Sequence, residues 1–289
     1  MINLNKALTM VTLSLALTAG MFLGLLPGVN PNSASPSTWL SSGTTLAKTV
    51  ATSGASASQL TWVMDWSTAK SIASNSAAVA AIKGATIYEI VKVGGKVAPG
   101  LPAIATLDFK SVSTMATDFA AGDIASWDHA VVYDPEHWSA TPLSEQLDVV
   151  AATAEAKQLA AKYHLTFIAT PATDLMEVLT PGKWPLYKDY LNYNLAGKCS
   201  TSDPNFFDIQ AQTLETHLTT YMTQTSGATA QVHAASPGTF VLGDVTDSIS
   251  GSSVPVTDVV AAIRASEADV SGYYLNAPVE GGAIIKALG

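Results

Sequence analysis

Arginine and cysteine are almost absent from this 289-residue sequence, which contains one of each, Arg264 and Cys199. A single cysteine excludes a disulfide framework within the chain and every zinc site built from several cysteines. A single arginine disfavours sites that clamp phosphates or carboxylates with several guanidinium groups. Phosphorylated and strongly acidic substrates are therefore poor candidates.

Positive charge is scarce as a whole. Only 14 lysines and arginines stand against 23 aspartates and glutamates, and the formal net charge is −9. A protein that binds nucleic acid needs a basic surface to neutralise phosphates, so we expect no nucleic-acid partner. Hydrophobic residues make up 48% of the chain, which is enough to form a core and argues against disorder over most of its length.

An uncharged apolar stretch covers residues 7–29 and follows Lys6. Such a stretch is typical of an export signal, and it is also long enough to span a bilayer. We therefore expect residues 1–35 to form a signal peptide or an N-terminal anchor, with the rest of the chain secreted or held outside the cytoplasm by this segment. Residues 36–58 are rich in Ser, Thr and Ala and predict a spacer before a domain at 59–289.

From residue 59 onward, short apolar runs alternate with Ala-rich helical stretches. Eight runs are typical of buried parallel strands: 60–64, 85–93, 102–107, 130–133, 165–169, 206–211, 239–242 and 270–275. The clearest helix is predicted over 142–163, with Thr141 as its N-cap, and another begins near Pro255. This alternation predicts a (β/α)8 TIM barrel. A doubly wound open sheet is the alternative, although no G-x-G-x-x-G follows the first run.

Polar residues stand where most of the predicted strands end. In a TIM barrel the active site gathers at the C-terminal ends of the strands, so these residues predict a ring facing a ligand. The ring consists of Asp65, Asp108, Asp134 with Glu136, Thr170 with Asp174, Gln210 with Gln212, Asp244 with Asp247, and Asn276. The alternative is that such residues begin loops and cap helices, Asp244 in particular.

The sharpest motif is the strand ending Tyr133-Asp134-Pro135-Glu136. Alternate residues of a strand point the same way, so Asp134 and Glu136 are expected to share the barrel mouth while Tyr133 points elsewhere. Two adjacent carboxylates repel each other, which raises the pKa of one of them and prepares it to act as a general acid. We predict that Glu136 is the acid and that Asp134 tunes or orients it. Capping of the following helix is the alternative.

The ending Asp134-Pro135-Glu136 resembles the end of the acidic strand-four motif of family-18 glycoside hydrolases, in which Asp-x-Glu ends the strand and the Glu is the acid. The resemblance implies a TIM barrel with glycosidase activity. It covers these residues and the barrel layout, because Val or Tyr stands where the family has a further aspartate and no Asp-Gly precedes them. The whole-chain pattern is also similar to secreted bacterial barrel proteins that have no assigned chemistry.

Amides and aromatic rings complete the predicted site. Amides donate and accept hydrogen bonds, as sugar hydroxyls require, and indole rings stack on the apolar faces of sugars. The predicted substrate-binding residues are Asp65, Trp66, Asp108, Trp138, Gln210, Gln212, Tyr274 and Asn276. Core packing and polar filling of the mouth are the alternatives for these residues. Glu215 is a further candidate for a second carboxylate.

Metal and cofactor chemistry finds little support in the sequence. The five histidines show no metal-ligand spacing, and no G-x-S-x-G motif occurs. We expect no metal and no cofactor, with a Ca²⁺ or Mg²⁺ site made by Asp65, Asp108, Asp134 and Glu136 as an open alternative.

The leading interpretation is a secreted glycoside hydrolase that acts on a neutral carbohydrate. A lyase or cyclase acting on an uncharged substrate and a non-catalytic carbohydrate-binding barrel are the alternatives. The expected partner is a glycan or another small molecule, and the membrane is involved only through an uncleaved N-terminal segment.

Overall fold

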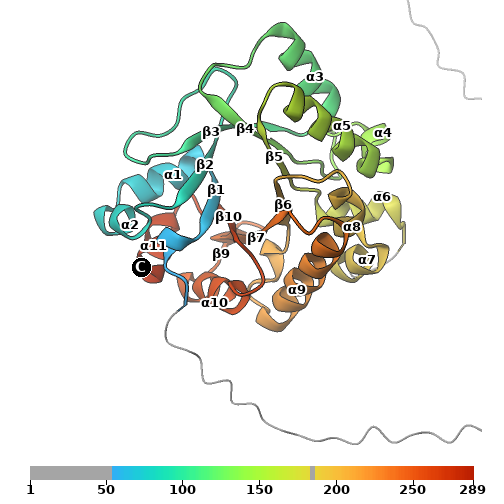
Figure 1. Ribbon diagram of the computed structural model, residues 1–289. Coiled ribbons are helices and arrows are strands. Elements are labelled where there is room, and N and C mark those ends of the chain that lie inside the picture. The colour runs from blue at the N-terminus through green and yellow to red at the C-terminus, as the bar shows by residue number, and fades with distance from the viewer. Residues whose placement is uncertain (1–53, 183–185) are drawn as a thin grey trace, which may run out of the picture. The chain divides into compact units, whose positions relative to one another are not determined.

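Eight parallel strands close into a barrel in the computed structural model, which describes residues 54–182 and 186–289 (Figure 1). The strands are β1 (Thr61–Asp65), β2 (Thr86–Val91), β3 (Ile104–Phe109), β4 (Asp128–Tyr133), β5 (Thr166–Ala169), β6 (Phe206–Ile209), β7 (Phe240–Thr246) and β10 (Gly272–Asn276). They follow one another around the barrel in chain order, and β10 closes it by pairing with β1 and β7. The predicted (β/α)8 TIM barrel is confirmed, and each of the eight predicted strands is present.

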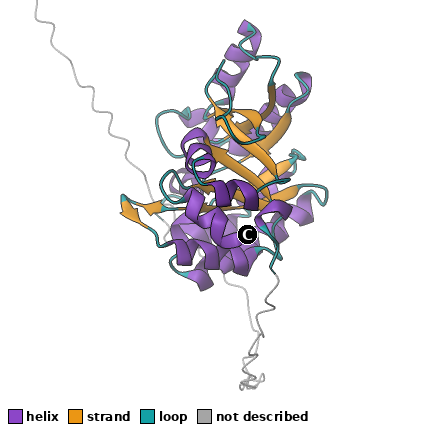
Figure 2. Ribbon diagram, turned by 90° about the vertical axis from the view of Figure 1, so that its left-hand side faces the viewer, coloured by secondary structure: helices purple, strands orange, loops and turns teal. Residues whose placement is uncertain are grey.

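Helices surround the strands on the outside of the barrel (Figures 1 and 2). They are α1 (Trp66–Ala73), α2 (Ser76–Ala81), α3 (Val112–Ala121), α4 (Leu143–Leu147), α5 (Val149–Lys162), α6 (Met176–Leu179), α7 (Leu186–Tyr193), α8 (Leu195–Ser200), α9 (Leu218–Ala235), α10 (Val256–Ser266) and α11 (Gly281–Leu288). A two-stranded antiparallel ribbon, β8 (Ser248–Ile249) with β9 (Ser252–Ser253), follows β7. Within residues 54–182 and 186–289, none of the helices combines the length and apolarity needed to cross a membrane.

The helix predicted over 142–163 is two helices, α4 and α5, separated at Asp148. Pro142 occupies the N-cap position of α4, and the hydroxyl of Thr141 donates to the carbonyl of Lys110 instead of capping the helix. The buried carboxylate of Glu145 on α4 accepts hydrogen bonds from Val112 N, at the start of α3, and from the hydroxyl of Tyr133. These inward bonds orient α4 independently of α5.

The last residues of the predicted spacer pack against the barrel. A 3₁₀ turn, η1 (Ala57–Gln59), follows the capping box of Ser56, and the indole nitrogen of Trp62 donates to the buried Ala57 carbonyl. The carbonyl of Ala55 accepts a hydrogen bond from Arg264. Residues 55–57 therefore contact the barrel, although they belong to the predicted spacer. Residues 1–53, which include the predicted export segment, lie outside the described residues.

Strand alternation divides the barrel into an outer face, which packs on the helices, and an inner face. The inner face carries a compact apolar layer that includes Val63, Ala130, Val132, Ile168, Phe206 and Leu242. Two residues further along their strands, the same face carries Asp134, Asp208 and Asp244. The C-terminal half of the barrel interior is therefore acidic, and it forms the floor of the mouth.

Candidate functional site

One lysine joins two of the predicted aspartates at the mouth. Lys110 follows β3, and its ammonium lies 3.1 Å from Asp108 Oδ2 and also contacts Asp134 Oδ2. Burial opposes the charge of Lys110, but the carboxylates of Asp134 and Asp108 outweigh burial and hold its pKa above the ordinary range. Lys110 is therefore a permanent cation of the site and not a neutral amine ready to form a Schiff base.

For the carboxyl of Asp108, the effect of burial on the pKa is larger than the effect of the neighbouring Lys110 charge. Burial raises the pKa of its carboxyl to about 6, although the nearby charge of Lys110 opposes this rise. Asp134 adds to the rise by its own negative charge. The ion pair with Lys110 is thus shared between two carboxyls of unequal environment.

Asp134 is held from three sides and is only 6% exposed. Besides Lys110, the hydroxyl of Thr170 and the amide of Gln210 each donate a hydrogen bond of 2.9 Å to its Oδ1. These donors follow β5 and β6, the next two strands around the barrel. Gln210, predicted to bind substrate, therefore also fixes the orientation of Asp134.

Glu136 stands on a loop that is pinned at several points. Its own N–H donates to the hydroxyl of Thr141, and the next N–H, of His137, donates to Asp174 Oδ1 at 3.0 Å. The carbonyl of Pro135 accepts from Ala172 N. A backbone fixed in this way keeps the Glu136 carboxyl at a defined place in the mouth.

The environment of Glu136 is suited to holding a proton. Burial raises its pKa to about 7, and the neighbouring charge of Asp134 adds to this rise while Lys110 opposes it. Asp134 and Glu136 both stand at the mouth of the barrel, where the charge of Asp134 disfavours ionisation of Glu136. Tyr133 points to the opposite face, where its hydroxyl donates to Glu145.

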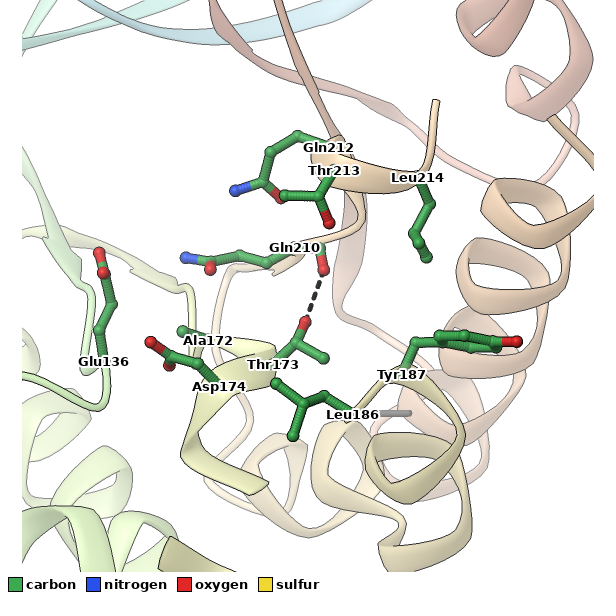
Figure 3. A pocket seen from close by; sticks show the side chains of 10 residues that line it. All are labelled: Glu136, Ala172, Thr173, Asp174, Leu186, Tyr187, Gln210, Gln212, Thr213 and Leu214. Atoms are coloured by element: carbon green, nitrogen blue, oxygen red, sulfur yellow. Dashed lines mark hydrogen bonds between the residues drawn. The ribbon is translucent and has the colours of Figure 1, made fainter. Parts of the chain in front are cut away.

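A pocket of about 400 Å³ lies against Glu136, on the side of β5 and β6. Figure 3 shows the carboxyls of Glu136 and Asp174 and the amides of Gln210 and Gln212 directed toward the same space, with Tyr187 at the far end. Thr173 is held by a 2.7 Å hydrogen bond to the Gln210 carbonyl, and Leu186 and Leu214 supply an apolar wall. We call this the acid pocket. The sequence places Asp174 at a strand end without giving it a role, whereas the structure sets it beside the acid.

A second pocket, of about 610 Å³, opens on the side of β1, β2 and β3. Its lining includes Asp65, Trp66, Lys92, Lys96 and Asp108. We call it the Trp66 pocket. Asp65 reaches it, but its carboxylate accepts from Thr68 N at 2.7 Å and from the hydroxyl of Ser67, so the helix-cap alternative describes this residue.

The remaining predicted substrate-binding residues differ in their position and in their exposure. Trp138 is 44% exposed and lies near the ion pair, with the Lys110 ammonium 5.7 Å from its ring centroid. Tyr274 is half-buried inside the barrel beside the apolar layer, and Asn276 is exposed at the end of β10. Neither of these two residues lines the acid pocket or the Trp66 pocket.

Two acids of the floor form the most unusual part of the barrel. Asp208 is fully buried and neither of its carboxyl oxygens has a hydrogen-bond partner among the described residues; one oxygen of Asp244 is in the same state. Burial raises both pKa values well above the ordinary range, and mutual repulsion between the two acids raises that of Asp244 further. Asp244 lies within β7 and is not a helix cap, because β7 extends four residues beyond the predicted end at 242.

Glu215, the further second-carboxylate candidate, is 2% exposed and accepts from Thr246 N with both oxygens. Burial raises its pKa to about 8. It belongs to the support behind β7 and lines neither pocket. Across the described residues, no three His, Cys, Asp or Glu side chains are grouped so as to hold a metal ion.

Comparison with known proteins does not assign this chain to a family. No protein-family model matches the sequence, and no curated protein does. One similar solved structure is described as a "putative phosphonomutase" from Burkholderia cenocepacia. The two chains share 14% sequence identity, the match covers 81% of this chain and 93% of the other, and the TM-score is 0.40. This likeness is too distant to carry an argument about chemistry.

Proposed function

We propose that this chain is an enzyme that cleaves a C–O bond, in the first place a glycosidic bond, of an uncharged, hydroxyl-rich substrate. The observation that carries the proposal is the Glu136 carboxyl, held by a pinned loop at the edge of the acid pocket with a pKa of about 7. A carboxyl that keeps its proton near neutral pH is what a general acid requires.

In hydrolysis, Glu136 donates its proton to the departing oxygen, which keeps the electron pair of the broken bond. A water molecule adds to the carbon and gives a proton to Asp174, the other carboxyl of the acid pocket. Burial raises the pKa of Asp174, so it accepts a proton more readily than an exposed aspartate does. Proton exchange with solvent then restores both groups.

The acid pocket supports an uncharged substrate. Its polar lining consists mainly of amides and hydroxyls, from Gln210, Gln212, Thr173 and Thr213, which bind sugar hydroxyls in either direction. The one cation beside Glu136, Lys110, is already paired with two aspartates. An anionic substrate would find no free counter-charge among the described residues of this pocket.

Elimination is the second candidate reaction. Glu136 and Asp174 reach the acid pocket from the loops after β4 and β5, which are neighbouring strands. An acid and a base that reach the same pocket suit the loss of a leaving oxygen, protonated by the acid, and of an adjacent C–H proton, taken by the base. Asp134 is less suited to the part of base, because three donors already engage its carboxylate.

The test is an assay of neutral oligosaccharides with the wild type and Glu136→Gln, followed by mass spectrometry in ¹⁸O-labelled water. Hydrolysis adds one labelled oxygen to the product, whereas elimination adds none and leaves a product that lacks the mass of one water. We expect Glu136→Gln to lower kcat by about 10²–10⁴-fold and the wild-type kcat to fall as pH rises through about 7. Glu155→Gln, an exposed glutamate on α5, is the matched control. Turnover by Glu136→Gln at the control's rate would refute the role of Glu136, and a panel without any product would leave the carbohydrate-binding alternative.

We also propose that the enzyme acts outside the cytoplasm, because residues 7–29 have the composition of an export segment. Fractionation of cells that express the full chain tests this proposal, and N-terminal sequencing of the exported form shows whether the segment is removed. Full-length protein found only in the cytoplasm would refute it.

A further inference from the structure

The acid pocket and the Trp66 pocket open on neighbouring parts of the barrel mouth. Asp108 lines the Trp66 pocket, while Glu136, two residues after Asp134, lines the acid pocket. Lys110 pairs with both Asp108 and Asp134 and so connects the ends of β3 and β4, which carry one residue of each pocket. Both pockets lie at the C-terminal ends of strands, because Asp65 ends β1 and Glu136 follows β4. A substrate bound at Glu136 and longer than the acid pocket would extend past this ion pair toward the Trp66 pocket.

Trp66 has the properties of a stacking platform. Its side chain is 47% exposed although it is the first residue of a helix that packs on the barrel. Asp65 caps that helix directly before it, and the Lys70 ammonium lies 5.0 Å from the ring centroid. The indole is therefore held in place while remaining open to a ligand. Exposed indoles stack on the apolar faces of flat or cyclic ligands.

The Trp66 pocket also has polar lining. Asp108, which lines it, keeps 20% of its side-chain surface exposed, and Lys110, its ion-pair partner, keeps 26%, so an acceptor and a donor for hydroxyl groups lie at or beside the pocket. An aromatic ring and a carboxylate in one pocket match a sugar ring, which presents apolar C–H groups on its face and hydroxyls at its edge.

We propose that the Trp66 pocket is a second binding site for the same substrate, which is an uncharged chain of at least two sugar-type rings. One ring lies in the acid pocket, the cleaved bond lies at Glu136 beside Lys110, and the next ring stacks on Trp66 with its hydroxyls at Asp108. This inference rests on the proposed function and extends it from a bond type to a substrate length.

The test measures binding, so that it does not depend on turnover. Glu136→Gln protein is titrated calorimetrically with cello-, xylo-, malto- and chito-oligosaccharides of one to six rings. We expect the affinity for one series to rise with the addition of the ring that reaches Trp66. When Trp66→Ala is added to Glu136→Gln, we expect this rise to be lost, so that the longer chains bind about tenfold more weakly. The affinity for single rings should not change. Trp66→Tyr keeps an aromatic face and retains most of the rise.

Two controls keep the result interpretable. Phe240→Ala removes another exposed aromatic ring, at the start of β7 and outside both pockets, and leaves the affinities unchanged. Thermal unfolding of each variant verifies that it is folded; if Trp66→Ala is not, Trp66→Leu decides, because it keeps apolar bulk without an aromatic face and should lose the rise.

Several results would overturn the inference. They are an affinity that does not increase with chain length, an increase that Trp66→Ala retains, and an absence of binding across the panel. Lys92 and Lys96 also line the pocket, so oligogalacturonate is titrated in parallel. Tighter binding of this anionic chain than of every neutral one, abolished in Lys92→Ala, would also overturn it. Failure here with Glu136→Gln still inactive would refute the second site alone, whereas activity of Glu136→Gln would refute the proposed function itself.

Discussion

The two halves of the barrel interior differ in the polarity of the side chains that the same strands point inward. In one half, Val132, Ile168 and Leu242 pack in an apolar layer with no exposed surface. Two residues further along β4 and β7, at the same strand face, stand Asp134 and Asp244. Burying an apolar side chain stabilises the barrel, whereas burying a carboxyl without full pairing destabilises it. The C-terminal half of the interior therefore contains ionisable groups that lower the stability of the barrel. Such groups are expected at a functional site.

The largest effect is expected when a charge is moved into the apolar layer. Ile168→Asp places an unpaired carboxyl among fully buried side chains and should destabilise the barrel by more than about 4 kcal/mol, enough to prevent folding in a protein of ordinary stability. Circular dichroism and thermal unfolding check this expectation. Ile168→Val is the control and should cost about 1 kcal/mol. A stably folded Ile168→Asp protein would show that the two halves do not differ in their tolerance of charge.

The next effect is expected when Lys110, the cation that joins Asp108 and Asp134, is removed. Lys110→Met leaves Asp108 and Asp134 without their ion pair and should destabilise by about 3 kcal/mol at pH 8. Protonation of Asp108 relieves its repulsion with Asp134, so the loss should shrink as pH falls below about 6, where Asp108 takes up a proton. Chemical denaturation at both pH values measures it. A loss that does not vary with pH would point to lost packing of the lysine chain.

Asp208→Asn should have a smaller effect of opposite sign. The folded-state pKa of Asp208 is raised, so the wild type loses stability as pH rises from the ordinary aspartate range toward that pKa. Removing the ionisable group should therefore stabilise the protein at pH 8, by on the order of 1–3 kcal/mol, and change little at pH 3.5. Asp123→Asn, at an exposed aspartate, controls for the loss of one negative charge. Equal stability of Asp208→Asn and wild type at pH 8 would mean that Asp208 is satisfied in solution.

The smallest loss of stability is expected at Asp65, which caps a helix and does not belong to the buried acids of the floor. Asp65→Ala removes the acceptor for Thr68 N and should cost about 1 kcal/mol, whereas Asp65→Ser keeps a capping oxygen and should cost less. The comparison of the two thermal midpoints decides whether the carboxylate charge of Asp65 matters. A loss of equal size in both variants would assign Asp65 to the charged network of the mouth.

The architecture could be predicted because the runs that become strands are short, apolar and followed by polar residues. Strand spacing also predicts that Asp134 and Glu136 share one mouth. Lys110 escaped prediction, although it stands two residues after Asp108 and strand alternation would have put both on one side. Lysine side chains mostly lie on solvated surfaces, so a lysine just after a strand does not by itself indicate a buried ion pair.

Other features depend on contacts between segments far apart in the chain. The break between α4 and α5 has no local mark in the sequence, because it follows from the bonds of Glu145 to Ser111, Val112 and Tyr133. Asp174 reaches Glu136 only because its carboxylate receives the N–H of His137 from the preceding loop. Asp65 and Asp134 both follow an apolar strand in the sequence. Only their contacts in the structure show that Asp65 caps a helix and that Asp134 pairs with Lys110.

The two sides of α4 differ in their freedom to change. On the inner side, Glu145 ties the start of α3, which follows Lys110, to Tyr133, which precedes Asp134. On the outer side, Leu143 and Leu147 are 60% and 55% exposed. Substitutions on the outer side can therefore accumulate without moving the lysine or the acids, whereas the glutamate cannot be exchanged alone. The inner side of α4 thus preserves the geometry of the mouth, whereas its outer side is free to change during evolution.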